Sequence, residues 1–230
     1  MSFKELASAA AVLLASTAGV YFWKFRPKPN TDFQQIQLLT PESYKEIAVQ
    51  IRESFNSKYW PELKICREQR RRSNPASPEY QSLVLNFQKV IKRILDESTY
   101  EVLSRFRIPK SVFEESVNFY DNDPALKEFG ENIIKPLPLE LTRSKMDAEK
   151  TKQILQSFSQ KLKERNADYA EVDEYLVATS QIEDEIFRAY KIEMEDFNAA
   201  VEKHKEYVNE ILDDMKQTTS AIMASSDNSF

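Results

Sequence analysis

Residues 77–97, SPEYQSLVLNFQKVIKRILDE, decide the fold class of this chain. Ser77 followed by Pro78 and Glu79 is typical of a helix start, because serine caps free N–H groups and proline already has a helical φ angle. Large apolar residues then recur three and four positions apart, on one helical face: Leu83, Phe87, Val90, Ile91, Ile94 and Leu95. Such a stripe has to be buried, so the segment predicts one member of a helical bundle.

Similar helix punctuation occurs on both sides of this segment. Thr40-Pro41-Glu42 predicts a helix start, and Trp60-Pro61 is expected to interrupt that helix. Asp123-Pro124 predicts another start, and Ser98 to Glu101 has the pattern of a capping box. Helical spacing continues over residues 146–162, 169–190 and 197–215, and a frayed polar tail is expected over 218–230.

Glycine is nearly absent from the sequence. The chain has 2 glycines in 230 residues, where average usage of roughly 7% would give about sixteen. Tight β-hairpins and phosphate-binding loops need glycine, so the composition favours an all-α fold. The alternating prolines of Lys135–Leu139 cannot be regular helix. We therefore expect four regions: a membrane anchor with its exit (1–29), a membrane-proximal helical half (30–134), a distal acidic helical half (139–217) and a flexible tail (218–230).

The N-terminal segment is predicted to be a single transmembrane helix. Residues 6–23 are uncharged and would span ~27 Å as a helix, enough to cross a hydrocarbon core. Aromatic and basic residues follow at the position of an interfacial anchor: Tyr21, Trp23, Lys24, Arg26 and Lys28. Their positive charge predicts a C-terminal domain on the cytoplasmic or matrix-like side. A cleaved signal peptide and a buried helix are the alternative interpretations.

Small residues recur every fourth position along the predicted membrane helix. They are Ala7, Ala11, Ala15 and Gly19. A row of this kind lets a second transmembrane helix approach closely, although an alanine-rich helix also produces such a row by chance. The row is a candidate surface for packing against other membrane helices.

Charge is unevenly distributed along the chain. Residues 139–230 carry 20 acids and 12 bases, and residues 1–138 carry 17 acids and 20 bases. The densest basic cluster, Arg67, Arg70, Arg71 and Arg72, is a candidate contact for acidic lipid headgroups or an acidic partner. The alternative is a solvated helix end. The acidic residues at 183–185 and 193–196 lack the spacing of a calcium loop and are attributed to capping and solvation.

A short sequence similarity suggests an internal repeat. Residues 101–108, EVLSRFRI, match residues 185–192, EIFRAYKI, and Phe113 and Val117 match Phe197 and Val201 at the same offset of 84. Each copy describes a helix, a tight corner and a second helix, with isoleucine placed as a hydrophobic staple. Either a true duplication or two similar helix corners would account for the match.

The composition argues against several classes of function. One cysteine, Cys66, and one histidine, His204, leave too few ligands for a zinc site, and they give no local signal of a nucleophile–base pair. We expect Cys66 to be a small buried residue and His204 a residue at the core edge. No catalytic site, cofactor, metal or nucleic-acid partner is predicted.

The sequence thus predicts a single-pass membrane protein that is not an enzyme. The first interpretation is a structural or accessory subunit of a membrane-embedded complex, most plausibly mitochondrial and of the respiratory-chain or ATP-synthase type. Its expected partners are membrane lipid, other transmembrane helices and other subunits, with the inner membrane favoured over the outer. The alternative is a signal-anchored adaptor with a cytosolic helical binding domain on the outer mitochondrial or endoplasmic reticulum membrane.

Overall fold

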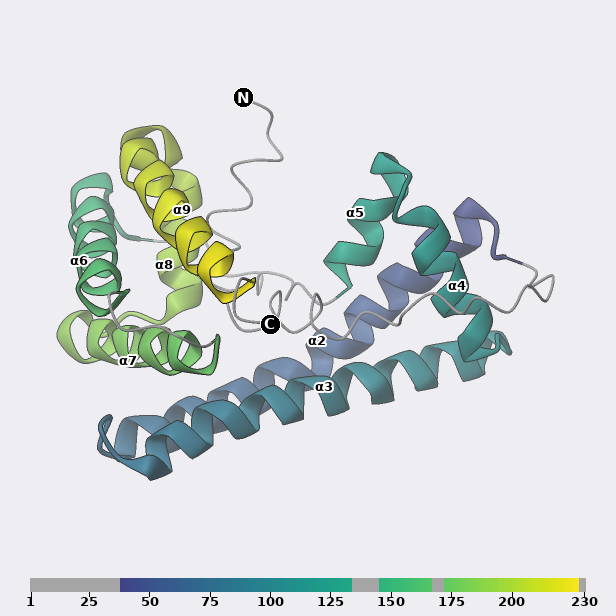
Figure 1. Ribbon diagram of the computed structural model, residues 1–230, viewed down its shortest axis with the longest axis horizontal. Coiled ribbons are helices and arrows are strands. Elements are labelled where there is room, and N and C mark those ends of the chain that lie inside the picture. Colours follow the sequence, from purple (N-terminus) through teal and green to yellow (C-terminus); the bar gives the residue numbers. More distant parts are fainter. Residues whose placement is uncertain (1–37, 134–144, 167–171, 228–230) are drawn as a thin grey trace. The chain divides into compact units, whose positions relative to one another are not determined.

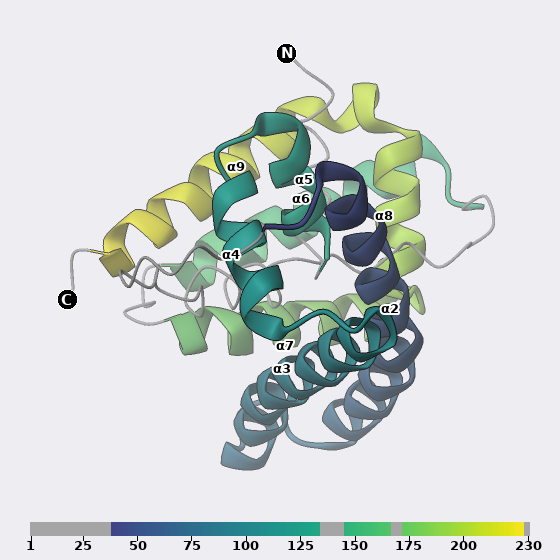
Figure 2. The same ribbon diagram turned by 90° about the vertical axis from the view of Figure 1, so that its right-hand side faces the viewer.

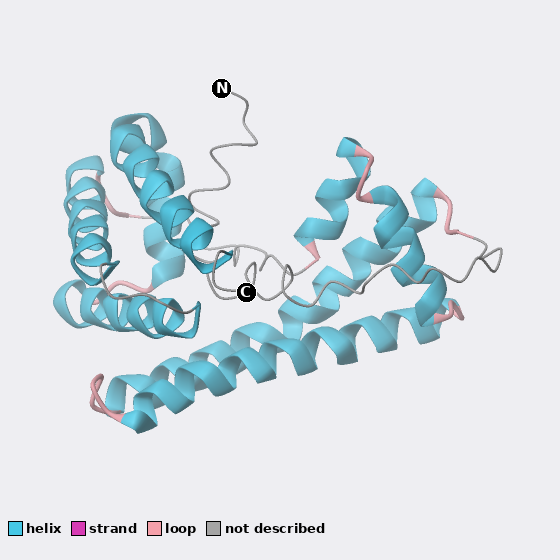
Figure 3. Cartoon of the chain, viewed as in Figure 1, coloured by secondary structure: helices cyan, strands magenta, loops and turns pink. Residues whose placement is uncertain are grey.

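A computed structural model describes residues 38–133, 145–166 and 172–227 of the chain. These residues form eight helices and no strand, which confirms the all-α expectation (Figures 1 and 3). The helices are α2 (Pro41–Arg72), α3 (Pro78–Phe106), α4 (Lys110–Tyr120), α5 (Pro124–Asn132), α6 (Ala148–Asn166), α7 (Val172–Tyr190), α8 (Met194–Lys203) and α9 (Lys205–Asp227).

The predicted membrane anchor and its exit, residues 1–29, lie outside the described residues. So do the proline-rich segment at 135–139 and the last three residues of the chain. Among the helices that are described, none is long and apolar enough to cross a membrane.

Contacts within the chain divide it into two units. The N-terminal unit comprises described residues 38–65 and 87–133, and the C-terminal unit comprises 66–86, 145–166 and 172–227. Helices α2 and α3 form a hairpin whose end, residues 66–86, therefore belongs to the C-terminal unit. We call this segment the hairpin tip. The division expected from the sequence, into regions 30–134 and 139–217, places the hairpin tip in the first region.

Helix α2 continues through Pro61, so the predicted interruption at Trp60-Pro61 is wrong. Proline removes one intrahelical hydrogen bond and costs about 3 kcal/mol. The apolar stripe on both sides of it outweighs that cost, since Phe55, Tyr59, Leu63 and Cys66 are all buried. Tyr59 also stacks on Phe55, with ring centroids 5.3 Å apart.

Two other local predictions need correction. Ser98 lies inside α3 with 0% exposure and caps no helix, because the stripe around it continues the helix to Phe106. The helix expected over 197–215 is broken at His204, which ends α8 with φ −110° and ψ 20°. The helix starts at Pro41, Pro78 and Pro124 are as predicted.

The core of the N-terminal unit lies between the start of α2 and helices α3, α4 and α5. Figure 2 shows α4 and α5 beside the first turns of α2. Tyr44 of α2 lies against Phe113 and Tyr120 of α4, with centroid distances of 6.1 and 5.0 Å. One cluster of buried side chains joins all four helices: Tyr44, Ile47, Ala48, Ile51, Val102, Leu103, Phe113, Tyr120, Leu126 and Ile133.

The core of the C-terminal unit is built around α6, which packs against α7, α8 and α9. Its apolar face, Ile154, Leu155, Phe158 and Leu162, is almost completely buried. The same cluster takes in side chains from the three other helices, among them Ile182, Ile186, Phe197, Val201, Val208 and Leu212.

The two units repeat one plan, and the similarity first seen in the sequence extends well beyond the helix corner. Arg107 and Lys191, 84 positions apart, are the two non-glycine residues of the described chain with positive φ, 56° in both. Each follows a helix and precedes a new one, α4 or α8. Ile108 packs in the same cluster as Phe113, and Ile192 in the same cluster as Phe197, as the staple predicts.

Polar contacts at equivalent positions support this correspondence. The Tyr120 hydroxyl donates to the Leu39 carbonyl at 2.6 Å, and His204 Nε2 lies 3.0 Å from the Met146 carbonyl. Leu39 and Met146 each stand two residues before the first helix of their unit, α2 or α6. A side chain at the end of the third helix thus holds the entry to the first helix in both units.

The ion pairs between the first two helices also correspond. Glu101 of α3 accepts from Lys58 of α2 at 3.0 Å, and Glu185 of α7 accepts from Arg165 of α6 at 2.6 Å. The acids differ by 84 positions and the bases by 107, the same offset that relates Leu39 to Met146. The difference has a simple structural origin: α2 has 32 residues and α3 has 29, whereas α6 and α7 have 19 each.

The first hairpin is longer than the second by 13 residues in α2 and 10 in α3. This extra length is close to the length of the hairpin tip, residues 66–86. Both units therefore consist of a hairpin, a left-handed corner and two more helices. The N-terminal copy carries an extension of its hairpin, and that extension belongs to the C-terminal unit.

Candidate interaction site at the hairpin tip

The hairpin tip presents three arginines to the C-terminal helices. Arg67, Arg70 and Arg71 lie on one face of the last turns of α2, because their spacing of three and four residues matches the helical repeat. The side chains of Arg67 and Arg70 are 8% and 5% exposed. Cations this deeply buried need partners, and the C-terminal unit supplies them.

Arg70 and Asp184 form the centre of the site. The Arg70 Nε and Nη2 atoms each donate to one oxygen of Asp184 at 3.1 Å, and Nη2 also donates to Glu183 at 3.2 Å. The Tyr80 hydroxyl of α3 donates to the same carboxylate at 2.7 Å. Asp184 is 0% exposed, so these bonds replace the water that the carboxylate loses.

Arg71 and Arg67 bind the start of α8. Arg71 donates through Nη1 and Nη2 to both oxygens of Glu193 at 2.7 Å, and its guanidinium stacks 3.5 Å from the centre of the Phe187 ring. Arg67 Nη1 donates to both oxygens of Glu195, at 2.7 and 2.8 Å. The two parallel bonds from Arg71 to Glu193 are the strong form of an arginine–carboxylate contact.

Apolar and backbone contacts complete the docking of the tip. Tyr80 and Val84 of α3 pack against Leu176 of α7 in a buried cluster. The Gln181 side chain donates to the carbonyl of Pro75, in the turn between α2 and α3, at 2.8 Å. The tip is therefore held both by apolar packing and by charge pairs, and Tyr80 takes part in both.

The pKa values in the site are consistent with a structural role. Burial opposes ionisation of Glu193, yet hydrogen bonds from Arg71 hold the pKa of this carboxyl below its usual range. Burial raises the pKa of Glu183, even though Arg70 acts in the opposite direction. Burial, with the negative charge of Asp184, also raises the pKa of Tyr80. Its phenol keeps its proton and serves as a hydrogen-bond donor.

The chemistry of the site is that of a binding contact between charged side chains. Burial raises the pKa of the Cys66 thiol, whereas a reactive cysteine needs a lowered pKa. The carboxylate oxygens of Asp184, Glu193 and Glu195 accept hydrogen bonds from arginine guanidinium groups. Within the part of the chain that the structure describes, no group of acidic, histidine or cysteine side chains is arranged to hold a metal ion.

The structure revises the interpretation of the arginine cluster. Arg67, Arg70 and Arg71 meet an acidic face of their own chain, so these three guanidinium groups are already occupied. The alternative of a solvated helix end is wrong for the buried Arg67 and Arg70. Arg72 is exposed, and its contact with lipid or a partner stays a prediction. The acidic residues at 183–184, 193 and 195 do more than cap and solvate, because each binds an arginine.

Two single residues lie close to where the sequence predicted them. Cys66 is buried, 7% exposed, and His204 is partly buried at the edge of the C-terminal core. The predicted packing row and interfacial anchor lie outside the described residues: Ala7, Ala11, Ala15, Gly19, Tyr21, Trp23, Lys24, Arg26 and Lys28.

The pairing between the two charged clusters was not predicted from the sequence, although a signal was present. Three arginines on one helical face and four acids around a helix corner are complementary, but more than 100 residues separate them. Each cluster alone also fits a solvated helix end. Comparing the chain with known protein families, with curated proteins and with solved structures finds no match.

Proposed function

We propose that the chain is a non-catalytic structural or accessory subunit of a membrane-embedded complex, and that its helical units bind helices of other subunits. The observation that carries this proposal is the docking of the hairpin tip. In the C-terminal unit, α7 and the start of α8 bind the two helix ends of the hairpin tip through Arg70–Asp184, Arg71–Glu193 and Arg67–Glu195. The same unit occurs twice, as in repeat proteins that serve as binding scaffolds.

The membrane part of the proposal rests on the sequence of residues 6–23, with its row of small residues and its aromatic and basic border. A mitochondrial complex of the respiratory-chain or ATP-synthase type, in the inner or outer membrane, is the setting that we propose. Other transmembrane helices, membrane lipid and neighbouring subunits are the proposed partners, and Arg72 is the remaining candidate for acidic lipid.

Native electrophoresis of the tagged full-length chain from gently solubilised mitochondria tests the proposal. We expect a discrete band of high mass that contains further subunits by mass spectrometry. Ala11→Leu and Ala15→Leu should weaken the association if the small-residue row packs against another helix. Migration at the mass of a monomer, or absence from mitochondria, would contradict the subunit proposal.

A second candidate function is that of a signal-anchored adaptor on the outer mitochondrial or endoplasmic reticulum membrane. The contacts of the hairpin tip favour it, because they lie entirely in the helical units and need no membrane segment. A fragment of residues 30–217 should then retain partner binding that the full chain shows. Loss of all binding in that fragment, with its helicity preserved, would exclude the adaptor.

A further inference from the structure

The ion cluster beneath the hairpin tip holds more acids than bases. Four carboxylates meet three guanidinium groups there: Glu183, Asp184, Glu193, Glu195, Arg67, Arg70 and Arg71. With all of these groups ionised, one negative charge would be in excess, and the central side chains of Arg70 and Asp184 are 5% and 0% exposed. A buried charge without compensation is costly, so the cluster favours the binding of one proton.

Glu183 is the carboxylate of the cluster with the least compensation. Asp184 accepts four hydrogen bonds, and Glu193 and Glu195 accept two each from one guanidinium group. Among the residues that the structure describes, Glu183 accepts a single bond, at 3.2 Å, from an Arg70 nitrogen that also donates to Asp184. Its side chain is 14% exposed. Of the four carboxylates, Glu183 therefore loses the least when it takes up the proton.

The charged and titratable groups around Glu183 come from four helices. They are two arginines of α2, a tyrosine of α3, an acid of α7 and two acids at the start of α8: Arg67, Arg70, Tyr80, Asp184, Glu193 and Glu195. The Cys66 thiol of α2 is also near, and the exposed ammonium of Lys191 lies 5.7 Å from the centre of the Phe187 ring. Burial has the largest influence on Glu183 and raises its pKa, while the two arginines act against it.

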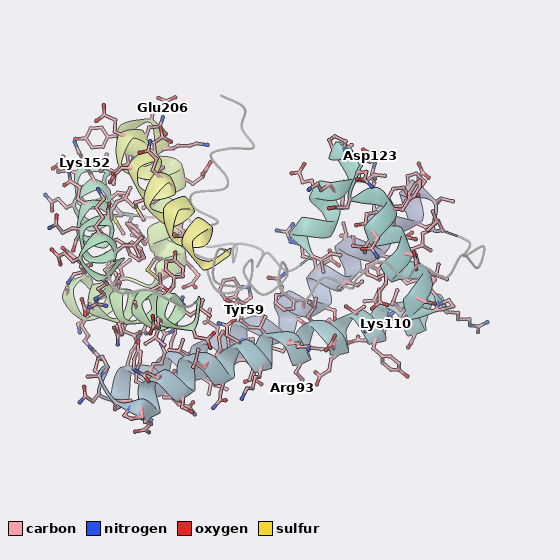
Figure 4. All side chains as sticks on the ribbon, in the orientation of Figure 1. Tyr59, Arg93, Lys110, Asp123, Lys152 and Glu206 are labelled. Atoms are coloured by element: carbon pink, nitrogen blue, oxygen red, sulfur yellow. The ribbon has the colours of Figure 1, made fainter. Side chains whose placement is uncertain are left out.

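We propose that Glu183 is a pH sensor for the hairpin tip: it carries a proton while the tip is docked on α7, and it is ionised when the tip is released. Rising pH then opposes docking, because an ionised Glu183 adds a buried negative charge beside Asp184. The tip begins about two turns beyond Tyr59 of α2, which is labelled in Figure 4. This inference concerns docking within the chain and does not depend on the subunit proposal.

The direction of the pH effect follows from two opposite pKa shifts. Burial raises the pKa of Glu183 above its usual 4.5, so its contribution to docking is complete below that value and is lost as the pH rises through the raised pKa. Burial opposes ionisation of Glu193, yet hydrogen bonds from Arg71 hold its pKa below 4.5, so its contribution is lost only at lower pH. Between pH 5 and pH 9 docking should therefore weaken by up to about tenfold for each pH unit above the pKa of Glu183.

Labelling of a cysteine placed in the docking contact measures the opening of the tip. Val84→Cys in a Cys66→Ala background puts the sole thiol of the chain against Leu176, where Val84 is 2% exposed. The protection factor is the iodoacetamide labelling rate of the urea-unfolded chain divided by that of the folded full-length chain in detergent at the same pH. We expect this factor to fall by about tenfold or more between pH 5 and pH 9.

Two variants with the same chemical change should act in opposite directions. Glu183→Gln keeps an acceptor for Arg70 but removes the charge, so it should be protected at least as well as its parent at every pH and should abolish the fall. Glu193→Gln removes the charge that Arg71 binds through two bonds, and should lower the protection factor several-fold at pH 7. Ala48→Cys in the Cys66→Ala background probes the core of the N-terminal unit and should show no fall over this range.

Three results would overturn the proposal. The first is a protection factor at Val84→Cys that does not change between pH 5 and pH 9. The second is a fall that Glu183→Gln retains, or a Glu183→Gln protein that is less protected than its parent at pH 7. The third is an equal fall at Ala48→Cys, because that would indicate global unfolding and not release of the tip.

Discussion

The N-terminal and C-terminal units share one helix plan but use the equivalent face in different ways. In the C-terminal unit this face is acidic and buried beneath the arginines of the hairpin tip. In the N-terminal unit the positions equivalent to the four acids are Thr99, Tyr100, Pro109 and Ser111, which carry no charge, and Tyr100 is 76% exposed. The core positions thus define the unit, whereas a few surface positions determine whether this face holds the hairpin tip.

The cores of the two units have buried residues at equivalent positions, although the residue types at those positions differ. With the offset of 107, Ile47, Ala48, Ile51 and Phe55 correspond to Ile154, Leu155, Phe158 and Leu162, and all eight are buried. In α5 and α9, Leu126, Gly130 and Ile133 have the spacing of Val208, Leu212 and Met215. Three of the four α2–α6 pairs differ in side-chain size, because each core is packed around its own set of neighbours.

The largest expected effect comes from breaking the buried pair at the centre of the tip. Arg70→Met leaves Asp184 buried without its main cation, and should lower the free energy of unfolding by about 3–5 kcal/mol. Urea unfolding followed by circular dichroism measures the change. Arg72→Met is the matched control, and should stay within about 0.5 kcal/mol because Arg72 is exposed. Similar losses in the two variants would contradict the assignment of the buried pair.

A second prediction concerns the contact between Gly130 and Tyr44. A Cβ at residue 130 would lie 2.6 Å from the Tyr44 hydroxyl oxygen. Tyr44 cannot move away, because it is 1% exposed and lies against Phe113 and Tyr120. Gly130→Ala should therefore cost about 1–3 kcal/mol in the free energy of unfolding.

The counterpart residues in the C-terminal unit explain how to relieve this clash. There Leu212 replaces the glycine and the smaller Thr151 replaces the tyrosine. In a Tyr44→Phe background the hydroxyl is gone, so Gly130→Ala should become neutral or stabilising by up to about 1 kcal/mol through helix propensity. A double-mutant cycle of unfolding free energies tests this, and additive effects would count against the contact.

The two left-handed corners allow a matched test of the repeat. Arg107 and Lys191 have φ of 56°, a conformation that glycine adopts without the penalty that a side chain brings. Arg107→Gly and Lys191→Gly should each raise the free energy of unfolding by about 0.5–1 kcal/mol. Thermal unfolding of both variants measures the gain. Stabilisation of only one of them would argue against equivalent corners.

The smallest expected effects come from the corresponding ion pairs. Hydrogen bonding to Lys58 holds the pKa of Glu101 below its usual range. Burial opposes ionisation of Glu185, yet hydrogen bonds from Lys161 and Arg165 hold its pKa low as well. Glu185→Gln should cost about 0.5–1 kcal/mol at pH 7, and Glu101→Gln less, because Glu101 is more exposed.

The pH dependence of these pairs has a defined sign. A carboxyl whose folded pKa lies below its unfolded value stabilises the protein above the unfolded value, and the stabilisation is lost as the pH falls through the folded pKa. The wild-type protein should therefore lose more stability on acidification than Glu185→Gln does. Urea midpoints between pH 7 and pH 3 test this, and parallel curves for the two proteins would contradict it.

Much of the fold, and little of the site, could be predicted from the sequence. Helix starts at Pro41, Pro78 and Pro124 were predictable because capping and proline act within a few residues. The passage of α2 through Pro61 was not, because burial of Tyr59 and Leu63 by distant segments decides it. The repeat was visible only at the corner, where Ile108 and Phe113 match Ile192 and Phe197, since the hairpins differ in length.

The site itself depends on contacts that no local pattern contains. Arg70 and Asp184 are 114 residues apart, and each belongs to a charged cluster that also fits the surface of an isolated helix. The apparent charge asymmetry between residues 1–138 and 139–230 was misleading for the same reason. The arginines counted with the basic half lie in the unit that holds the acids.

Amide hydrogen exchange of the full-length protein in detergent, with and without Arg70→Met, tests most directly whether α7 and α8 form a docking face held by the tip. We expect faster exchange in residues 66–86, in α7 and in α8 of the variant, with protection in α4 and α5 retained. Unchanged protection in α7 and α8, or an equal loss in α4 and α5, would contradict it.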